Sequence, residues 1–169
     1  SLHDALPILA SGATLTAALA GARAPVLVPV FSALALGLTV LATATRAVAL
    51  VRNARLAPRS TLQTAIGIRH PVIRQRAMGF MGGSFNTREF FHGREPGTLR
   101  WVRWVMLAAG FAVPAALLAG VLATEGPAVT NQWLLALAMA VQGAGLLAER
   151  WYFFAQARHP QNLYYQAVS

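Results

Sequence analysis

Three long stretches without a charged residue constrain the fold of this chain more than any other feature. They cover residues 24–45, 104–124 and 126–148 and contain 22, 21 and 23 residues. At about 1.5 Å per residue, each forms a helix roughly 31–35 Å long, enough to cross a hydrocarbon core of about 30 Å. With 56% hydrophobic and 11% charged residues, the chain is also more apolar than ordinary soluble domains, in which about a quarter of residues are charged. The sequence therefore predicts an all-α fold, a polytopic bundle of transmembrane helices.

Charges and turn residues set the expected limits of the spans. We predict full spans at residues 26–51, 101–123 and 129–154, and the end of a truncated span at residues 9–22, which are too few to cross a bilayer alone. Residues 52–100 then form an extramembrane loop with helical parts.

The first eight residues, SLHDALPI, resemble the peptide encoded by a common short-read sequencing adapter. We therefore predict that residues 1–8 are a sequencing-adapter artefact outside the natural fold. The natural sequence then begins near Leu9, inside a helix, and residues 9–169 are expected to come from a longer protein.

Local signals predict two short helices in the loop. Ser60, with Gln63 three residues later, fits a capping box, in which the Ser hydroxyl accepts a backbone N–H bond and the Gln side chain reaches back. This predicts a helix at residues 61–68 that ends before Pro71. Pro71 can itself open a second helix at residues 71–80.

Two features of the spans predict how the helices bend and pack. Pro114 lies inside the third span and is expected to kink it, because proline cannot donate the backbone hydrogen bond of a helix interior. Small residues recur at every fourth position of the last span, and such a ridge is expected to pack closely against another helix. The ridge consists of Ala136, Ala140, Ala144 and Ala148.

The basic residues gather in one part of the chain. The net charge is +9, all fourteen basic residues are arginine, and ten of them lie between Arg52 and Arg103. Beside membrane spans, such a segment indicates a topology signal, a contact with lipid headgroups or a docking face, and we do not expect nucleic acid as a partner. The chain has no cysteine, so thiolate metal sites and iron–sulfur ligation are not expected within it.

Glu149 is the candidate for chemistry inside the membrane. Gln142 and Glu149 are seven residues apart and lie near one face of a helix, with Tyr152 one turn further on. An ionisable residue at membrane depth is a candidate proton carrier or a partner for a quinol hydroxyl. The alternative is a structural pair between Glu149 and a basic residue such as Arg46, which we otherwise expect to snorkel from its helix end toward the interface.

The loop carries the remaining candidates. His70 could exchange protons near neutral pH, and no metal site is expected because the histidines share no metal-ligand spacing. The candidates for docking a partner are the basic and imidazole side chains Arg69, Arg74, Arg76, Arg88 and His92.

Two segments together resemble a known family. The sequence TLQTAIGIRHPVIRQRAMGFMGGSFNTREFFHG, followed two spans later by LLAERWYFFAQARHPQNLYYQ, is similar to the membrane-anchor subunit of dimethyl sulfoxide reductase-type molybdoenzymes. The resemblance covers the chain from about Leu9 onward and corresponds to the C-terminal half of such an anchor.

The resemblance implies an eight-helix, multi-pass anchor in the bacterial inner membrane that oxidises menaquinol during anaerobic respiration. Electrons would pass to a partner subunit with iron–sulfur clusters and then to a catalytic subunit with a molybdopterin cofactor. This chain would be the non-catalytic anchor and electron-transfer subunit and would bind no cofactor itself. Because the groups that contact quinol in related anchors lie largely in the N-terminal half, a complete quinol site is not expected here.

Other interpretations stay open. The chain could be a non-redox membrane scaffold or assembly protein with a basic docking loop, or a small transporter, which would need broken helices and charges at the membrane midplane. The side of the loop is also open. Positive-inside counting puts residues 52–100 in the cytoplasm, whereas the resemblance puts them on the outer face with the catalytic partners.

Overall fold

The computed structural model describes residues 2–56, 61, 63–64, 67–72, 96–124 and 128–156. Within these residues all regular secondary structure is helical, which confirms the predicted all-α fold. The elements are α1 (Leu2–Arg23), the 3-10 turn η1 (Pro25–Leu27), α2 (Val28–Arg55), α5 (Pro96–Leu107), the π-helical turn η2 (Ala108–Ala112), α6 (Val113–Ala123) and α7 (Ala128–Gln156).

Four helical runs are long and apolar enough to cross a membrane: Ala5–Arg23, Pro25–Arg55, Gly97–Ala123 and Val129–Phe153. The first run differs from expectation, because α1 continues back to Leu2 and residues 5–8 extend segment 9–22 to the length of a span. The adapter origin of residues 1–8 stays a prediction, since a helix of suitable length says nothing about where its codons came from.

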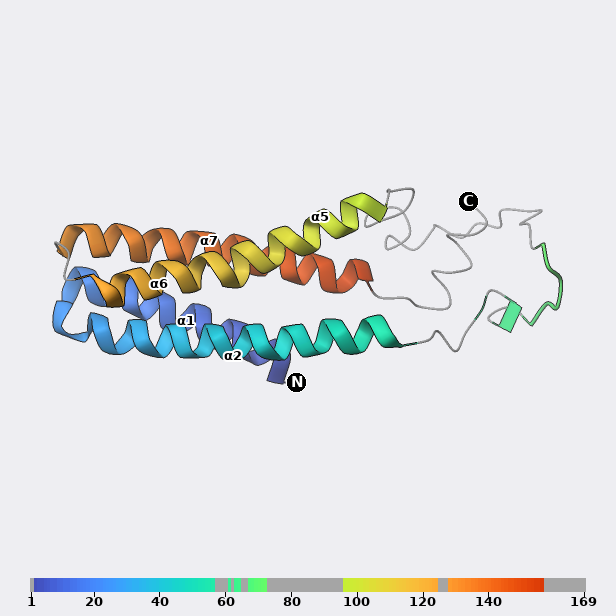
Figure 1. Cartoon of the computed structure of the whole chain (residues 1–169), viewed down its shortest axis with the longest axis horizontal. Helices are drawn as coiled ribbons and strands as arrows, with labels where there is room; N and C mark the ends of the chain where they lie inside the picture. The colour runs from blue at the N-terminus through green and yellow to red at the C-terminus, as the bar shows by residue number, and fades with distance from the viewer. Residues whose placement is uncertain are drawn as a thin grey trace, which may run out of the picture.

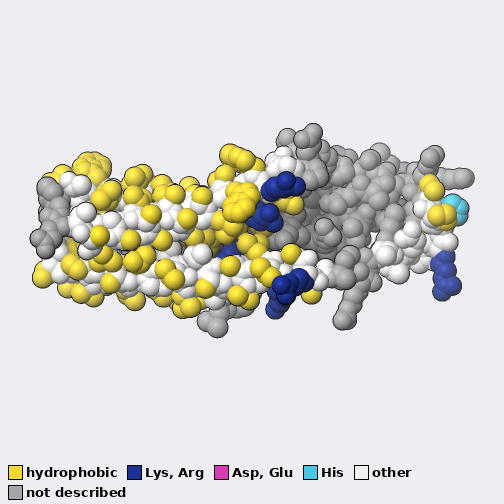
Figure 2. All heavy atoms as spheres, in the orientation of Figure 1, with side chains coloured by type: hydrophobic (Ala, Val, Ile, Leu, Met, Phe, Trp, Pro, Cys, Tyr) yellow, Lys and Arg dark blue, Asp and Glu magenta, His cyan; other side chains and the backbone are white. Residues whose placement is uncertain are grey.

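The helices form an elongated bundle (Figure 1). α2 packs along α1 and α6, while α7 packs along α1, α5, η2 and α6, so α2 and α7 occupy diagonally opposite positions. The turn between α1 and α2, the end of α6 and the start of α7 lie at one end of the bundle. The end of α2, the start of α5 and the end of α7 lie at the other, which we call the basic end because it carries Arg52, Arg55, Arg100 and Arg103 (Figures 1 and 2).

The buried faces of the helices follow a heptad pattern. In α2 the buried positions recur at alternating intervals of four and three residues: Val28, Ser32, Ala35, Thr39, Ala42 and Arg46. In α7 the same alternation relates Leu135, Ala138, Gln142, Gly145, Glu149 and Tyr152. This spacing keeps one stripe of each helix facing its neighbours, as in left-handed bundles.

The buried hydroxyl groups of two threonines are satisfied within their own helices. The Oγ1 atoms of Thr14 and Thr39, both fully buried, donate to the carbonyl oxygens of Ala10 and Ala35 at 3.0 and 2.7 Å. A hydroxyl that bonds back to the preceding turn can be buried without a partner on another helix.

The third span departs from α geometry one turn before its proline. Pro114 stands at the start of α6, directly after the π-helical turn Ala108–Ala112. Proline offers no N–H to the carbonyl four residues earlier and its ring crowds that carbonyl, and a wider turn is one way for a helix to accommodate it. The distortion that Pro114 was expected to cause therefore takes the form of a π-helical turn at η2.

The outer surface of the bundle is apolar (Figure 2). Trp101 and Trp104 near the basic end are 68% and 61% exposed, and Trp133 near the other end is 72% exposed. Exposed indoles near both ends match the aromatic belts of membrane proteins. The small-residue ridge also belongs to this outer surface: Ala136, Ala140 and Ala144 are exposed, so its predicted packing role is wrong among the described helices, where the Gly145 stripe faces inward instead.

The predicted capping box lies partly outside the described residues, because Ser60 is not among them, and the described residues show a further capping pair. Thr61 Oγ1 accepts a bond from the Thr64 backbone N–H at 3.3 Å, and the Thr61 N–H donates to Thr64 Oγ1 at 2.8 Å. The reciprocal capping pair is thus Thr61 and Thr64. Gly67, with φ of 73°, adopts the left-handed conformation typical of the residue after a helix, so the predicted helix at residues 61–68 does not continue through Gly67. The predicted helix at residues 71–80 lies almost entirely outside the described residues.

Candidate functional site in the bundle core

Two diagonal helices place polar side chains at matching heights inside the bundle. α2 carries Thr39 and Arg46, and α7 carries Gln142 and Glu149, with a seven-residue interval in each helix. All four residues are buried, with exposed fractions between 0% and 4%. Because α2 and α7 are diagonally opposite in the bundle, side chains that connect these two helices meet across its centre.

The contact nearer the basic end is an ion pair. Arg46 Nη1 lies 3.1 Å from Glu149 Oε1, and both side chains are 5% exposed. The half-exposed Arg150 approaches the other carboxylate oxygen, with 4.0 Å between its Nε and Glu149 Oε2. Glu149 therefore lies between a buried and a partly exposed arginine.

Arg46 points inward, so the predicted snorkelling toward the interface is wrong. Its Nη2 lies 3.8 Å from the sulfur of Met106, which is fully buried. Arg46 belongs to the buried heptad positions of α2, so its side chain faces the core, where Glu149 supplies the compensating charge. The alternative that Glu149 pairs with Arg46 is confirmed.

The contact two turns deeper in the bundle is a hydrogen bond. Gln142 Nε2 donates to Thr39 Oγ1 at 3.3 Å, and the same hydroxyl donates to the Ala35 carbonyl. Among the described residues, four buried side-chain atoms have no hydrogen-bond partner: Ser32 Oγ, Asn131 Oδ1 and two that belong to this core, Gln142 Oε1 and Arg46 Nε. Buried polar atoms are rarely left in this state, so these two atoms identify the core as a place where further polar contacts would be favourable.

The arrangement can hold opposite charges inside the bundle and can bond to a polar ligand. An isolated charge at membrane depth costs about 3 kcal/mol on insertion scales, and the pairing of opposite charges offsets that cost. The Glu149 carboxylate can accept hydrogen bonds, and the Thr39 hydroxyl and Gln142 amide can bond to a hydroxyl or carbonyl group. Such chemistry suits a quinol, which exchanges electrons together with protons.

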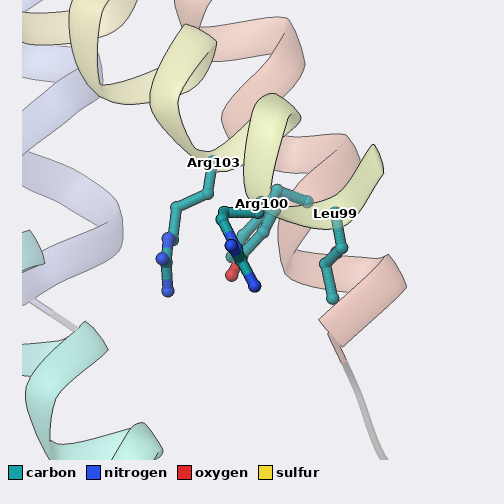
Figure 3. Close-up of a pocket in the computed structure, with 4 residues that line it drawn as sticks. Leu99, Arg100 and Arg103 are labelled. Atoms are coloured by element: carbon teal, nitrogen blue, oxygen red, sulfur yellow. The ribbon is translucent and has the colours of Figure 1, made fainter. Parts of the chain in front are cut away.

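A cavity opens next to this core at the basic end. It has a volume of about 280 Å³ and is lined by Leu99, Arg100, Arg103 and Tyr152 (Figure 3). Tyr152, 3% exposed, lies one turn after Glu149 on α7. The cavity therefore adjoins the helix segment that carries the buried carboxylate.

The loop candidates lie apart from this core. His70 and Arg69 are exposed in a segment that lies beyond the basic end of the bundle (Figure 1). His70 Nδ1 lies 2.6 Å from the Val72 carbonyl oxygen and 3.1 Å from the Val72 nitrogen, so the ring contacts the backbone two residues further along the chain. The docking candidates Arg74, Arg76, Arg88 and His92 lie outside the described residues. No group of three or more metal-ligating side chains occurs within the part of the chain that the structure describes.

Sequence reasoning missed several residues of this region. Thr39, Met106 and Gly145 contribute to the core, and Arg100 and Arg103 line the cavity. One signal was present: Thr39 and Arg46 have the same interval as Gln142 and Glu149, and matching polar intervals on two spans predict paired contacts.

The fold and the buried core together indicate a class of protein. Four long apolar helices with a charge pair between them fit a multi-pass membrane protein. Comparison with known proteins then gives one particular likeness. The chain is 49% identical, over 160 residues and 95% of its length, to one of the subunits of the sulfite dehydrogenase of Allochromatium vinosum, and it spans about half (48%) of that relative.

This likeness relates the chain to a subunit of a sulfite dehydrogenase and does not single out the dimethyl sulfoxide reductase anchor. No family model matches the chain, and no solved structure does.

Proposed function

We propose that this chain is a membrane subunit of a multi-subunit oxidoreductase that exchanges electrons with quinone in a bacterial inner membrane. The observation that carries the proposal is the buried polar core between two candidate spans, in which Gln142 Oε1 and Arg46 Nε have no hydrogen-bond partner among the described residues. Ionisable residues at membrane depth cost free energy even when paired, so they are functional candidates by default. The 49% identity to a sulfite dehydrogenase subunit supports the oxidoreductase setting.

In this proposal the chain anchors an iron–sulfur subunit and a molybdopterin catalytic subunit and binds no redox cofactor itself. The candidate docking groups are the basic residues of the loop. The quinone is the substrate of the membrane part. Glu149 transfers one proton to or from the quinone. Gln142 and Thr39 orient its oxygen atoms. The described residues supply part of such a site, since the chain spans about half of its relative.

The direction of electron flow has two candidates. The resemblance to dimethyl sulfoxide reductase anchors favours the oxidation of menaquinol, with electrons leaving the membrane for the catalytic subunit. The name of the 49% identical relative favours the reverse direction, because a sulfite dehydrogenase removes electrons from sulfite and a quinone could accept them. We favour quinone reduction, since this likeness is an identity of 49% over 160 aligned residues.

The test is purification of the chain from membranes in mild detergent together with the subunits that accompany it. We expect molybdenum and iron at fixed ratios to the protein, and sulfite-dependent reduction of a soluble quinone analogue. A complex that instead oxidises a menaquinol analogue would identify the opposite direction. A metal-free preparation without accompanying subunits would favour a membrane scaffold.

A matched pair of variants tests the role of the core. We expect Arg46→Gln with Glu149→Gln to assemble, because both buried charges are removed together, yet to lower quinone turnover about a hundredfold or more, the range for loss of a positioned proton donor or acceptor. Arg23→Gln removes an arginine at the opposite end of the bundle and should leave turnover unchanged. Unchanged turnover in the double variant would contradict the role of Glu149.

A further inference from the structure

The cavity at the basic end has the composition of an anion site. Arg100 and Arg103 lie one turn apart on α5 and extend to the same side of the helix (Figure 3). Tyr152 joins them from the end of α7, so the cavity bridges two helices that are far apart in sequence. Its volume of about 280 Å³ can hold a group the size of a phosphodiester with part of its glycerol.

No described residue neutralises the two arginines. Among the described residues, the ion pairs of Glu149 are made with Arg46 and Arg150, and no carboxylate lies within 4.0 Å of Arg100 or Arg103. Arg103 contacts the face of Trp104 instead, with its Cζ 6.0 Å from the ring centroid. Two positive charges that share one cavity repel each other, and a bound anion would remove that repulsion.

The residue types also suit one class of anion. Guanidinium groups bind phosphate oxygens through two parallel N–H bonds, and a tyrosine hydroxyl can donate a third bond. Tyr152 is 3% exposed, so its ring is held rigidly and loses little freedom when its hydroxyl engages a ligand.

The position of the cavity along the bundle axis indicates that the phosphate belongs to a lipid headgroup. The exposed indoles of Trp101 and Trp104 share α5 with the two arginines, and such indoles lie at headgroup level. Apolar surface borders the dark-blue side chains at this end of the bundle and continues toward its middle (Figure 2). Basic pockets between transmembrane helices at this level bind anionic headgroups.

We propose that Arg100, Arg103 and Tyr152 bind the phosphodiester of an anionic phospholipid. The lipid phosphate links α5 to α7, and its acyl chains lie along the apolar face of the bundle. This places an anionic lipid one helical turn from Glu149, at the end of the bundle where the buried ion pair lies. The proposal stands on the cavity alone and holds whether or not the core exchanges protons with quinone.

The experiment uses the purified protein, with the subunits that accompany it, after removal of native lipid by detergent exchange. Phosphatidylglycerol and phosphatidylcholine are titrated separately, bound lipid is counted by native mass spectrometry, and the melting temperature is followed in parallel. We expect phosphatidylglycerol to bind at a fixed stoichiometry and to raise the melting temperature, with phosphatidylcholine doing so at more than about tenfold higher concentration.

The variant is Arg100→Gln with Arg103→Gln, and the control is Arg52→Gln with Arg55→Gln, which removes the same charge at the same end of the bundle. We expect the pocket variant to weaken phosphatidylglycerol binding about tenfold or more and the control to change it less than about threefold. Tyr152→Phe removes one hydroxyl only and should weaken binding a few-fold, which keeps the test open should the double variant fail to fold.

Three outcomes would overturn the proposal. Equal weakening in variant and control would mean diffuse attraction of lipid by the whole basic end. Equal binding of phosphatidylcholine would mean that the negative charge is not recognised. Inorganic phosphate that raises the melting temperature as much as phosphatidylglycerol, with no further effect of lipid, would assign the cavity to free phosphate.

Discussion

At the scale of single residues, the core of this protein depends on charges that compensate each other across the centre of the bundle. Arg46 and Glu149 approach to 3.1 Å with almost no solvent access, and sulfur is the other polar neighbour of Arg46 among the described residues. Loss of one partner therefore leaves a buried charge without compensation, whereas loss of both leaves two neutral amides that can bond to each other.

We predict that Glu149→Gln alone lowers the free energy of unfolding by about 3 kcal/mol, because Arg46 stays charged at membrane depth. Combining it with Arg46→Gln should recover most of that loss. Unfolding by denaturing detergent in mixed micelles gives both values. Costs that simply add in the double variant would show that the two side chains are not coupled.

At the scale of secondary structure, the crossing of α7 over η2 is the closest helix contact at any glycine of the described bundle. A Cβ on Gly145 would overlap the backbone of Gly110 and Ala109, whereas a Cβ on Gly110 would lie 3.5 Å from the Gly145 carbonyl carbon, an ordinary contact distance. Small residues at such crossings let the backbones approach. The π turn at Ala108–Ala112 lies at this crossing, so the distortion before Pro114 and the glycine contact occupy the same place.

We predict that Gly145→Ala lowers stability by about 1–3 kcal/mol or prevents assembly, because α7 must move away from η2. Gly143→Ala is the matched control, since no described atom lies within 4 Å of its added methyl group. It should be neutral or slightly stabilising, as alanine favours helix over glycine. Melting temperature and the yield of folded protein in detergent report both, and equal effects would argue against the close crossing.

At the scale of the whole molecule, the bundle has two unlike ends joined by an apolar body (Figure 2). The basic end carries the arginines of α2 and α5, and the opposite end holds the α1–α2 turn and the end of α6. A body of this length and polarity is expected to lie across a membrane with one end on each side.

Because the chain has no cysteine, single cysteines report the sidedness without background. We predict that cysteines at Ala24 and Thr124 react with a membrane-impermeant maleimide from one side, and cysteines at Arg55 and Gly97 from the other. Labelling of residues 55 and 97 from the cytoplasm would agree with positive-inside counting, and labelling from outside would agree with the family resemblance. Reaction of residues 24 and 124 from opposite sides would contradict the four-span arrangement.

The class of fold was predictable because it depends on local properties. Whether a segment can cross a membrane follows from its length and the absence of charge, and the three uncharged stretches show both without knowledge of any neighbour. The rotation of each helix about its axis was not predictable in the same way. Nothing in the repeat of Ala136, Ala140 and Ala144 states that it faces outward, since small residues suit either a crossing or a lipid-facing surface.

The sequence by itself determined that this chain is helical, apolar enough to cross a membrane and basic in one region, and it marked Glu149 as an unusual acid. Only the tertiary structure decided that Arg46 turns inward to meet Glu149, that Thr39 receives Gln142, and that Arg100 and Arg103 share a cavity with Tyr152. The physical reason is that these contacts join residues on helices far apart in the sequence, and their geometry depends on which helix faces which. Local sequence propensity does not determine which helices face each other.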